Sequence, residues 1–252
     1  MTDDQQLIQE ALQWKARFLR KDSMLERFSK GMQAKINERI PDKIHAVITE
    51  SIKKMTEATM AGSNLVKSKR DTNGMTLAEK DALARQTIVS YQKVAAAEGI
   101  GTGAGGIFLG MADFPLLLSI KMKCLFDLAS IYGYDVKDRD ERLFLLFIFQ
   151  LAFSSGEQRK RIYSMIEQWD SKKHDVDWRV LQQEYRDYLD VVKLFQLLPV
   201  VGAAVGGAAN YKLLSQLGET ARHVFHLRIT AAGTLRTGCF LCPIGGSSPR
   251  HR

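Results

Sequence analysis

LFLLFIFQLAF, residues 143–153, is apolar on nearly every side when it is wound into a helix. A helix of this kind has no face suited to water, so it belongs in the interior of a bundle. The run is also too short to cross a bilayer, which takes about 20 apolar residues. The rest of the chain shows helical periodicity and no sustained alternation of apolar and polar residues. The sequence therefore predicts an all-α protein, a single multi-helix bundle around this segment.

Local signals place the other helices. Residues 76–79, TLAE, form a capping box that starts a helix running to about residue 97. Asp113-Phe114-Pro115 starts a helix that Gly133 ends, and Pro41 divides a long apolar series into two helices, 23–40 and 41–61. The remaining helices are predicted over 5–20, 138–152, 154–169, 177–198 and through the segment ending at 226.

Two runs rich in glycine and alanine stand out, at residues 99–110 and 200–209. Residues 101–106 satisfy GxGxxG, but a dinucleotide site needs a strand before that motif, and here a helix precedes it. Small residues let helices approach closely, so we expect the two runs to pack against each other in or near the core. The glycines expected to make these contacts are Gly101, Gly103, Gly106, Gly202 and Gly206.

The net charge of +8 is concentrated near the N-terminus. Residues 14–70 contain 14 Lys and Arg against six Asp and Glu, which equals the excess of the whole chain. Lys and Arg opposite a Met/Phe/Ile stripe suit an amphipathic helix on anionic lipid. A solvated bundle helix is the alternative. Nucleic acid is disfavoured as a partner because the stretch lacks a recognised binding module and has few interleaved aromatic residues.

The sequence gives no motif for a reaction, a metal or a cofactor. Glu219, His223 and His226 share one helical face, but nothing completes a metal site. Cys239 and Cys242 form a single CxxC, whereas structural zinc needs a second pair of ligands. Neither GxSxG nor GxxxxGK[ST] occurs. We therefore expect no catalytic residues, no bound metal and no cofactor.

Polar and charged side chains beside the two glycine-rich runs are the best candidates for a binding site. If the runs meet, Asp113 could pair with Lys212, or both could line a pocket. A structural ion pair, with Asp113 capping the helix that follows it, is the alternative. The candidate binding residues are Glu98, Asp113, Lys121, Asn210, Lys212 and Glu219.

Three stretches of the chain resemble the EcsC family of bacterial proteins. They are AEGIGTGAGGIFLGMADFPLLLSIKMKCLFDLASIYGYD at 97–135, FLLFIFQLAFSSGEQRKRIYSMIEQWD at 144–170 and VDWRVLQQEYRDYLDVVKLFQLLPVVGAAVGGAANYKLLSQLGETA at 176–221. The likeness runs from about residue 5 to 228. It implies an accessory role at an ABC transporter, because the name-giving member is encoded beside a transporter's ATPase and membrane subunits. It supplies no catalytic residues.

These observations predict three parts: a basic amphipathic helical arm (1–75), an EcsC-like helical core (76–228) and an atypical, disordered tail (229–252). The acidic start without an apolar segment predicts a cytoplasmic protein. We expect a non-enzymatic accessory protein, peripheral on the inner face of the cell membrane, whose partners are an anionic membrane surface or ABC transporter subunits. The sequence does not decide whether the protein forms a homo-oligomer. The alternative is a soluble helical enzyme or ligand-binding protein with a pocket near Glu98, Asp113 and Lys212.

Overall fold

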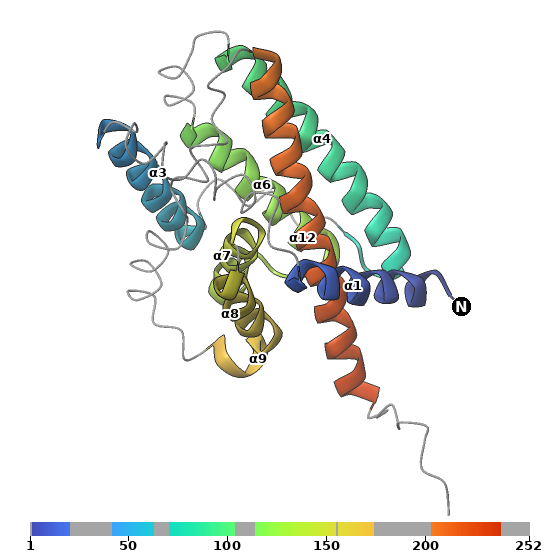
Figure 1. Ribbon diagram of the computed structural model, residues 1–252. Helices are drawn as coiled ribbons and strands as arrows, with labels where there is room; N and C mark the ends of the chain where they lie inside the picture. Colours follow the sequence, from blue (N-terminus) through green and yellow to red (C-terminus); the bar gives the residue numbers. More distant parts are fainter. Residues whose placement is uncertain are drawn as a thin grey trace, which may run out of the picture.

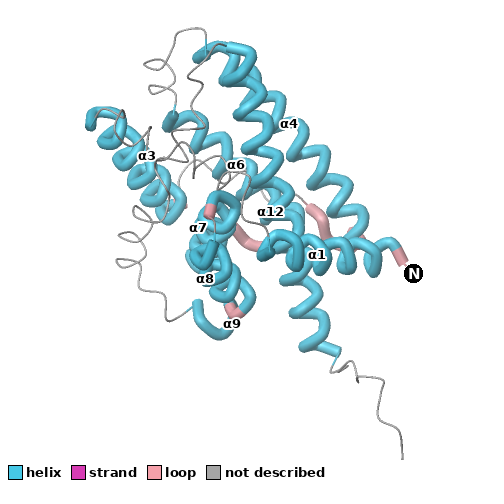
Figure 2. The backbone as a smooth tube through the Cα atoms, viewed as in Figure 1, coloured by secondary structure: helices cyan, strands magenta, loops and turns pink. Residues whose placement is uncertain are grey.

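The computed structural model describes residues 2–20, 42–62, 71–103, 114–154, 156–173 and 203–237. All regular secondary structure in these ranges is helical, which confirms the predicted all-α class (Figures 1 and 2). The described helices are α1 (Asp3–Arg20), α3 (Asp42–Ala61), α4 (Leu77–Gly103), α6 (Phe114–Tyr132), α7 (Arg139–Phe153), α8 (Gly156–Glu167), α9 (Trp169–Lys172) and α12 (Ala203–Thr237).

The two longest helices, α4 and α12, lie side by side and run in opposite directions (Figure 1). Close approaches follow the pair along its length: Asp81 meets Arg222, Ile88 meets Gly218, and Ile100 meets Gly207. At Gly218, an added Cβ would lie 2.7 Å from the Ile88 side chain. Glycine therefore sets the separation of the two helices, as close helix packing requires.

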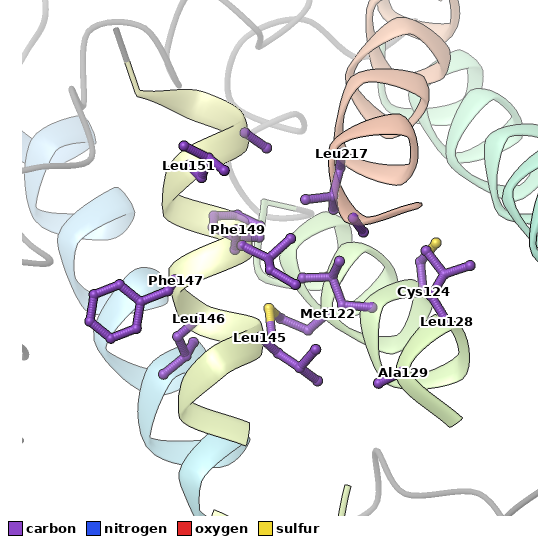
Figure 3. Packing of buried hydrophobic residues seen from close by; sticks show 14 of the residues in the cluster. Met122, Cys124, Leu128, Ala129, Leu145, Leu146, Phe147, Phe149, Leu151 and Leu217 are labelled. Atoms are coloured by element: carbon purple, nitrogen blue, oxygen red, sulfur yellow. The ribbon is translucent and has the colours of Figure 1, made fainter. Parts of the chain in front are cut away.

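Helix α7 carries the segment from which the fold was predicted, and it is buried as expected. Every residue from Leu143 to Phe153 is buried. Figure 3 shows Met122 of α6, Leu145 of α7 and Leu217 of α12 contributing to one core, while Phe147 points from α7 toward α3. Fully burying a side chain of this size is worth about 1.5–3 kcal/mol, so this helix anchors the bundle.

The helices of the predicted arm that the structure describes pack on the core. Ala11 of α1 is fully buried, and the Asp4 carboxylate of α1 accepts a 2.9 Å hydrogen bond from the Ala78 backbone N–H. That bond satisfies one of the free N–H groups in the first turn of α4. Ile52 of α3 is also buried in the core.

Most helix ends follow the predicted signals. Thr76 and Glu79 form the expected reciprocal capping bonds, with Thr76 N–H donating to Glu79 at 2.7 Å. Gly133 ends α6 with φ +95°. Two helices are longer than predicted, since α4 continues to Gly103 and α12 continues to Thr237, which makes residues 229–237 of the predicted tail helical. The helices predicted over 23–40 and 177–198 lie outside the described residues.

Candidate functional site

A buried polar cluster joins α4, α6 and α12 around Asp81. The Asp81 side chain accepts hydrogen bonds from Arg222 at 2.8 Å, from Arg85 at 2.8 Å and from the Tyr132 hydroxyl at 3.3 Å. His226 Nε2 lies 2.9 Å from the same carboxylate. Asp81 is 3% exposed and His226 is fully buried. The carboxylate is therefore surrounded by donors and has little access to solvent.

The cluster reaches α1 through a second set of contacts on α12. Arg222 also donates to Glu219 at 2.8 Å, and His223 Nε2 lies 3.5 Å from the same Glu219 oxygen. The His223 ring stacks on Trp14 of α1 with 5.0 Å between centroids. Aromatic pairs at this separation stabilise packing beyond the area that they bury. The cluster therefore links four helices.

The environment holds the cluster's carboxylates in their charged form. Burial by itself would raise the pKa of Asp81, but hydrogen bonds from His226, Arg222 and Arg85 hold that pKa well below its usual value. Burial likewise opposes the charged form of Glu219, yet bonds from His223 and Arg222 lower its pKa to about 2. Buried carboxylates are stabilised in this way when donors replace lost water.

Tyr132, which belongs to this cluster, and Cys124, which lies elsewhere on α6, both have a raised pKa. Burial raises the pKa of Tyr132, and the negative charge of Asp81 raises it further, so the phenol keeps its proton. Burial also raises the pKa of the Cys124 thiol, which is fully buried. A nucleophile or general base needs a pKa near the working pH and access to substrate. Both groups therefore keep their protons, and the hydrogen bonds of the cluster join α4, α6 and α12.

A different surface lies at the end of the bundle where the described parts of the two glycine-rich runs meet. The last turns of α4 and the first turns of α12 lie at this end (Figure 1). Several large apolar side chains of α4, of the first turn of α6 and of α12 are exposed. We call these residues the apolar end: Val94 (52% exposed), Ile100 (52%), Leu116 (48%) and Tyr211 (44%). Lys93 and Lys212, next to two of them in the chain, are exposed as well.

The expectation that the two glycine-rich runs pack together finds support at one contact. Gly207 of α12 approaches α4 so closely that an added Cβ would lie 2.8 Å from Ile100 and 3.0 Å from the Ala96 carbonyl oxygen. Gly101, Gly103 and Gly206 lie in the adjoining turns of α4 and α12. Gly106 and Gly202 lie outside the described residues, so their role stays a prediction.

The structure places the predicted binding residues in different surroundings. Lys212 is exposed, Glu98 is half-buried on α4, and Glu219 belongs to the Asp81 cluster. Asn210 is 1% exposed, and neither amide atom of its side chain has a hydrogen-bond partner in the described part of the chain. Lys121 is 4% exposed, and burial lowers its pKa to about 8. Asp113 lies outside the described residues.

Sequence reasoning missed Asp81 as the centre of the polar cluster. It singled out Glu219, His223 and His226 as neighbours on one helical face, and that placement is correct. Glu219 pairs with Arg222 and His223, whereas His226 contacts Asp81, which lies 141 residues before Arg222 in the chain. The only local signal is an acidic residue between apolar positions of an amphipathic helix, which is common on solvated faces.

Neither a metal-ligand cluster nor a membrane-spanning helix occurs among the described residues. No group of three or more His, Cys, Asp or Glu side chains in these ranges is arranged to hold a metal ion. Among the helices described, none combines the length and apolar character that crossing a bilayer requires.

Comparison with known proteins identifies the family. The model of the EcsC protein family matches residues 5–230. Protein EcsC of Bacillus subtilis (strain 168) is 74% identical over 229 residues, which cover 91% of this chain and 97% of that protein. The uncharacterized protein YdbA of the same organism is 30% identical over 171 residues, covering 65% of this chain and 63% of YdbA. No solved structure gives a significant match. The chain belongs to the EcsC protein family.

Proposed function

We propose that this protein is a non-enzymatic accessory protein that binds peripherally to an anionic membrane surface, on the cytoplasmic side, through its apolar end. The observation that carries this proposal is the group of exposed apolar side chains at Val94, Ile100, Leu116 and Tyr211. Val94, Ile100, Leu116 and Tyr211 belong to three neighbouring helices, and exposed apolar surface supports an interaction or membrane-binding role when it is contiguous.

Two positive charges next to the apolar end support binding to anionic lipid. Lys93 and Lys212 are exposed there, and each lysine near an anionic surface contributes about 1 kcal/mol. Burying four half-exposed apolar side chains adds on the order of 1 kcal/mol each. Binding of this strength is reversible and weakens with salt, as a peripheral protein requires.

The proposal includes a link to an ABC transporter system. Its support is the family resemblance, whose name-giving member is encoded beside transporter subunits. A surface that holds the protein at the membrane would keep it beside such a transporter, so the two parts of the proposal are compatible.

Flotation of the protein with vesicles tests membrane binding. The protein should rise with vesicles of phosphatidylcholine and phosphatidylglycerol at low salt, rise less at high salt, and stay at the bottom with phosphatidylcholine alone. If it stays at the bottom with the anionic vesicles at low salt, the proposal is wrong.

A ligand-binding or enzymatic role is the second candidate, and one observation favours it. The Asn210 amide and the Lys121 ammonium are buried polar groups, and the described residues give the amide no partner. Such groups are normally hydrogen-bonded, so a polar ligand near this end could satisfy them. A protein that fails to float but is stabilised by a small polar metabolite would favour this candidate.

A further inference from the structure

Helix α1 packs beside α12 and α8, and few of its side chains are buried (Figure 1). Ala11 is fully buried, whereas Trp14 packs against the core while only partly buried. The ion pairs of α1 with Glu167 of α8 and with Arg85 of α4 join side chains that are 30–51% exposed. Exposed pairs of this kind contribute little to stability. Helices with few buried contacts open at a lower free-energy cost than the core does.

A pocket with a volume of about 460 Å³ separates part of α1 from its neighbours. Its walls come from α1, the α8–α9 segment and α12, and α1 supplies Ile8, Leu12 and Lys15. Protein interiors contain few voids larger than a water molecule. The middle of α1 is therefore not closely packed on this side, and the position of α1 decides whether the pocket has its third wall.

The middle of α1 is joined to α12 by an aromatic stack of Trp14 on His223, with 5.0 Å between ring centroids. His223 is buried, and the Arg222 guanidinium lies 3.4 Å from its Nε2. A guanidinium can only donate, so this contact suits a neutral imidazole that accepts at Nε2. The other ring nitrogen, Nδ1, is buried and has no hydrogen-bond partner among the described residues.

A proton added to His223 meets surroundings that oppose it. Both ring nitrogens of an imidazolium donate, so Nε2–H would face the Arg222 guanidinium and Nδ1–H would have no acceptor. Stacking on Trp14 attracts a cation, but the indole offers no acceptor to Nδ1–H. Burial, and then the charge of Arg222, lowers the pKa of His223 below its ordinary 6.5, although Glu219 opposes this shift.

The other titratable and charged groups around His223 come from several helices. Those nearest to it in the network are Glu219, Arg222 and His226 of α12, Asp81 and Arg85 of α4, and Glu10 of α1. Tyr132 of α6 contacts His226, while Glu141 of α7 and Glu167 of α8 pair with Arg228 and Lys15. Glu219 is the carboxylate paired with the His223 ring, at 3.5 Å, but it also accepts a 2.8 Å hydrogen bond from Arg222. Its charge is therefore shared between two cations once His223 is protonated.

We propose that protonation of His223 releases α1 from α12, and that this release removes one wall of the pocket between α1, the α8–α9 segment and α12. When α1 moves away, water reaches the face of the ring that Trp14 covers in the docked state. The contacts of Asp4 with Ala78 and of Arg159 with Phe18 also hold α1, and neither involves an imidazole. The docked state should therefore lose stability as the pH falls below about 6.5.

Amide hydrogen exchange of the full chain at pH 7.0 and pH 5.5, corrected for the intrinsic exchange rate at each pH, tests this proposal. At pH 7.0 the amides of α1 should be less protected than those of α7, because α1 opens while the core stays folded. At pH 5.5 the protection of α1 should fall by about threefold to eightfold. Eightfold is the limit set by a ring of ordinary pKa 6.5 that binds its proton only in the open state.

His223→Phe is the matched variant, since phenylalanine keeps an aromatic ring beside Trp14 and has no nitrogen to protonate. Its α1 amides should be equally protected at the two pH values. Equal protection of α1 and α7 in the parent chain would overturn the proposal, because α1 would then leave only when the whole protein unfolds. Protection of α1 that does not change with pH, or that falls equally in His223→Phe, would also overturn it. The parent chain alone decides the first two outcomes, whether or not the variant folds.

Discussion

Asp81 lies in the second turn of α4, and its carboxylate accepts hydrogen bonds from α4, α6 and α12. A buried charge is tolerated only when partners replace the water that it has lost. Here Arg222 supplies the opposite charge and is itself 3% exposed. The two residues therefore depend on each other, and removing either one leaves the other charged without a full set of partners.

Asp81→Asn should lower the free energy of unfolding by about 3–5 kcal/mol, because it removes one of the two carboxylates that pair with the buried Arg222, the other being the partly exposed Glu219. Urea denaturation followed by circular dichroism measures the change. Glu157→Gln is the matched control, since it removes a carboxylate from an ion pair with Lys160 in which Glu157 is 87% exposed. It should cost less than about 1 kcal/mol. Equal losses of unfolding free energy for the two substitutions would show that the buried Asp81–Arg222 pair contributes no more than an exposed ion pair.

Acidification should destabilise the fold in two steps. Burial lowers the pKa of His223 below its ordinary 6.5, so the unfolded chain takes up this proton first and stability falls as the pH drops below about 6.5. The pKa values of Asp81 and Glu219 are lowered too, so their stabilisation is present above about pH 5 and is lost as the pH falls toward 2.

Urea midpoints measured from pH 7 down to pH 3 test this order. His223→Phe should remove the first step and leave the second. A midpoint that rises between pH 7 and pH 5.5 in the parent chain would contradict the assignment of His223 as a buried, neutral residue.

At the scale of helices, the separation of α4 and α12 depends on glycines that face branched side chains. Gly218 lies against the buried Ile88, and Gly207 lies against Ile100 and the Ala96 carbonyl. Alanine ordinarily stabilises a helix by roughly 0.5–1 kcal/mol relative to glycine. At these positions the added methyl group has no room, so the sign of that effect should reverse.

Gly218→Ala should lower the free energy of unfolding by about 1–3 kcal/mol, because the methyl group overpacks the contact with Ile88. The same substitution in an Ile88→Ala background should be neutral or slightly stabilising, since the space is then open. A double-mutant cycle measures the difference. Additive effects of the two substitutions would show that the contact does not set the helix separation.

The sequence predicted the positions of the helices better than the contacts between them. The Thr76–Glu79 capping box, Gly133 and the apolar run at 143–153 each act within a few residues, and each prediction is confirmed. The end of α4 was placed too early because a glycine-rich run looks like a helix break, although Ile100 of that run packs against Gly207. The end of α12 was placed too early because the stretch after residue 228 has no acidic residues and the composition of a tail. The Asp81–Arg222 pair joins distant parts of the chain, so no local pattern could reveal it.

The apolar end likewise has one feature that the sequence predicts and one that depends on the fold. The glycine-rich runs predicted close helix packing at one end of the bundle, and Gly207 makes such a contact with α4, because small residues permit close approach. Which side chains stay exposed there depends on the arrangement of α4, α6 and α12. Val94, Leu116 and Tyr211 look like ordinary core residues in the sequence, and only the fold shows that they face water.

At the scale of the whole molecule, α12 connects two surfaces of different character. Its first turns belong to the apolar end, and its middle carries the partners of Asp81. Farther along, Val224, Leu227, Arg228, Thr230 and Ala231 line a pocket beside α1. The proposed membrane surface and this pocket are therefore separate, and substitutions can affect one without the other.

Val94→Glu combined with Leu116→Glu should abolish flotation with anionic vesicles, because two carboxylates would be forced toward anionic lipid at the apolar end. Leu12→Glu is the control, with the same exposure as Val94 but a position on α1, and it should float like the parent chain. Thermal melting of each variant shows whether the fold is kept. Equal loss of flotation in both variants would point to general charge repulsion and not to a specific surface.

Contact between lipid and Tyr211 can be observed by placing a fluorophore there. Tyr211→Trp substitutes one aromatic residue for another at a site that is 44% exposed. Its emission can be compared with that of the parent chain on anionic vesicles containing lipids with brominated acyl chains. If the apolar end enters the membrane surface, the variant should lose more fluorescence to the bromines than the parent does. Equal quenching of the variant and the parent, while both are bound to vesicles, would show that another face holds the protein at the membrane.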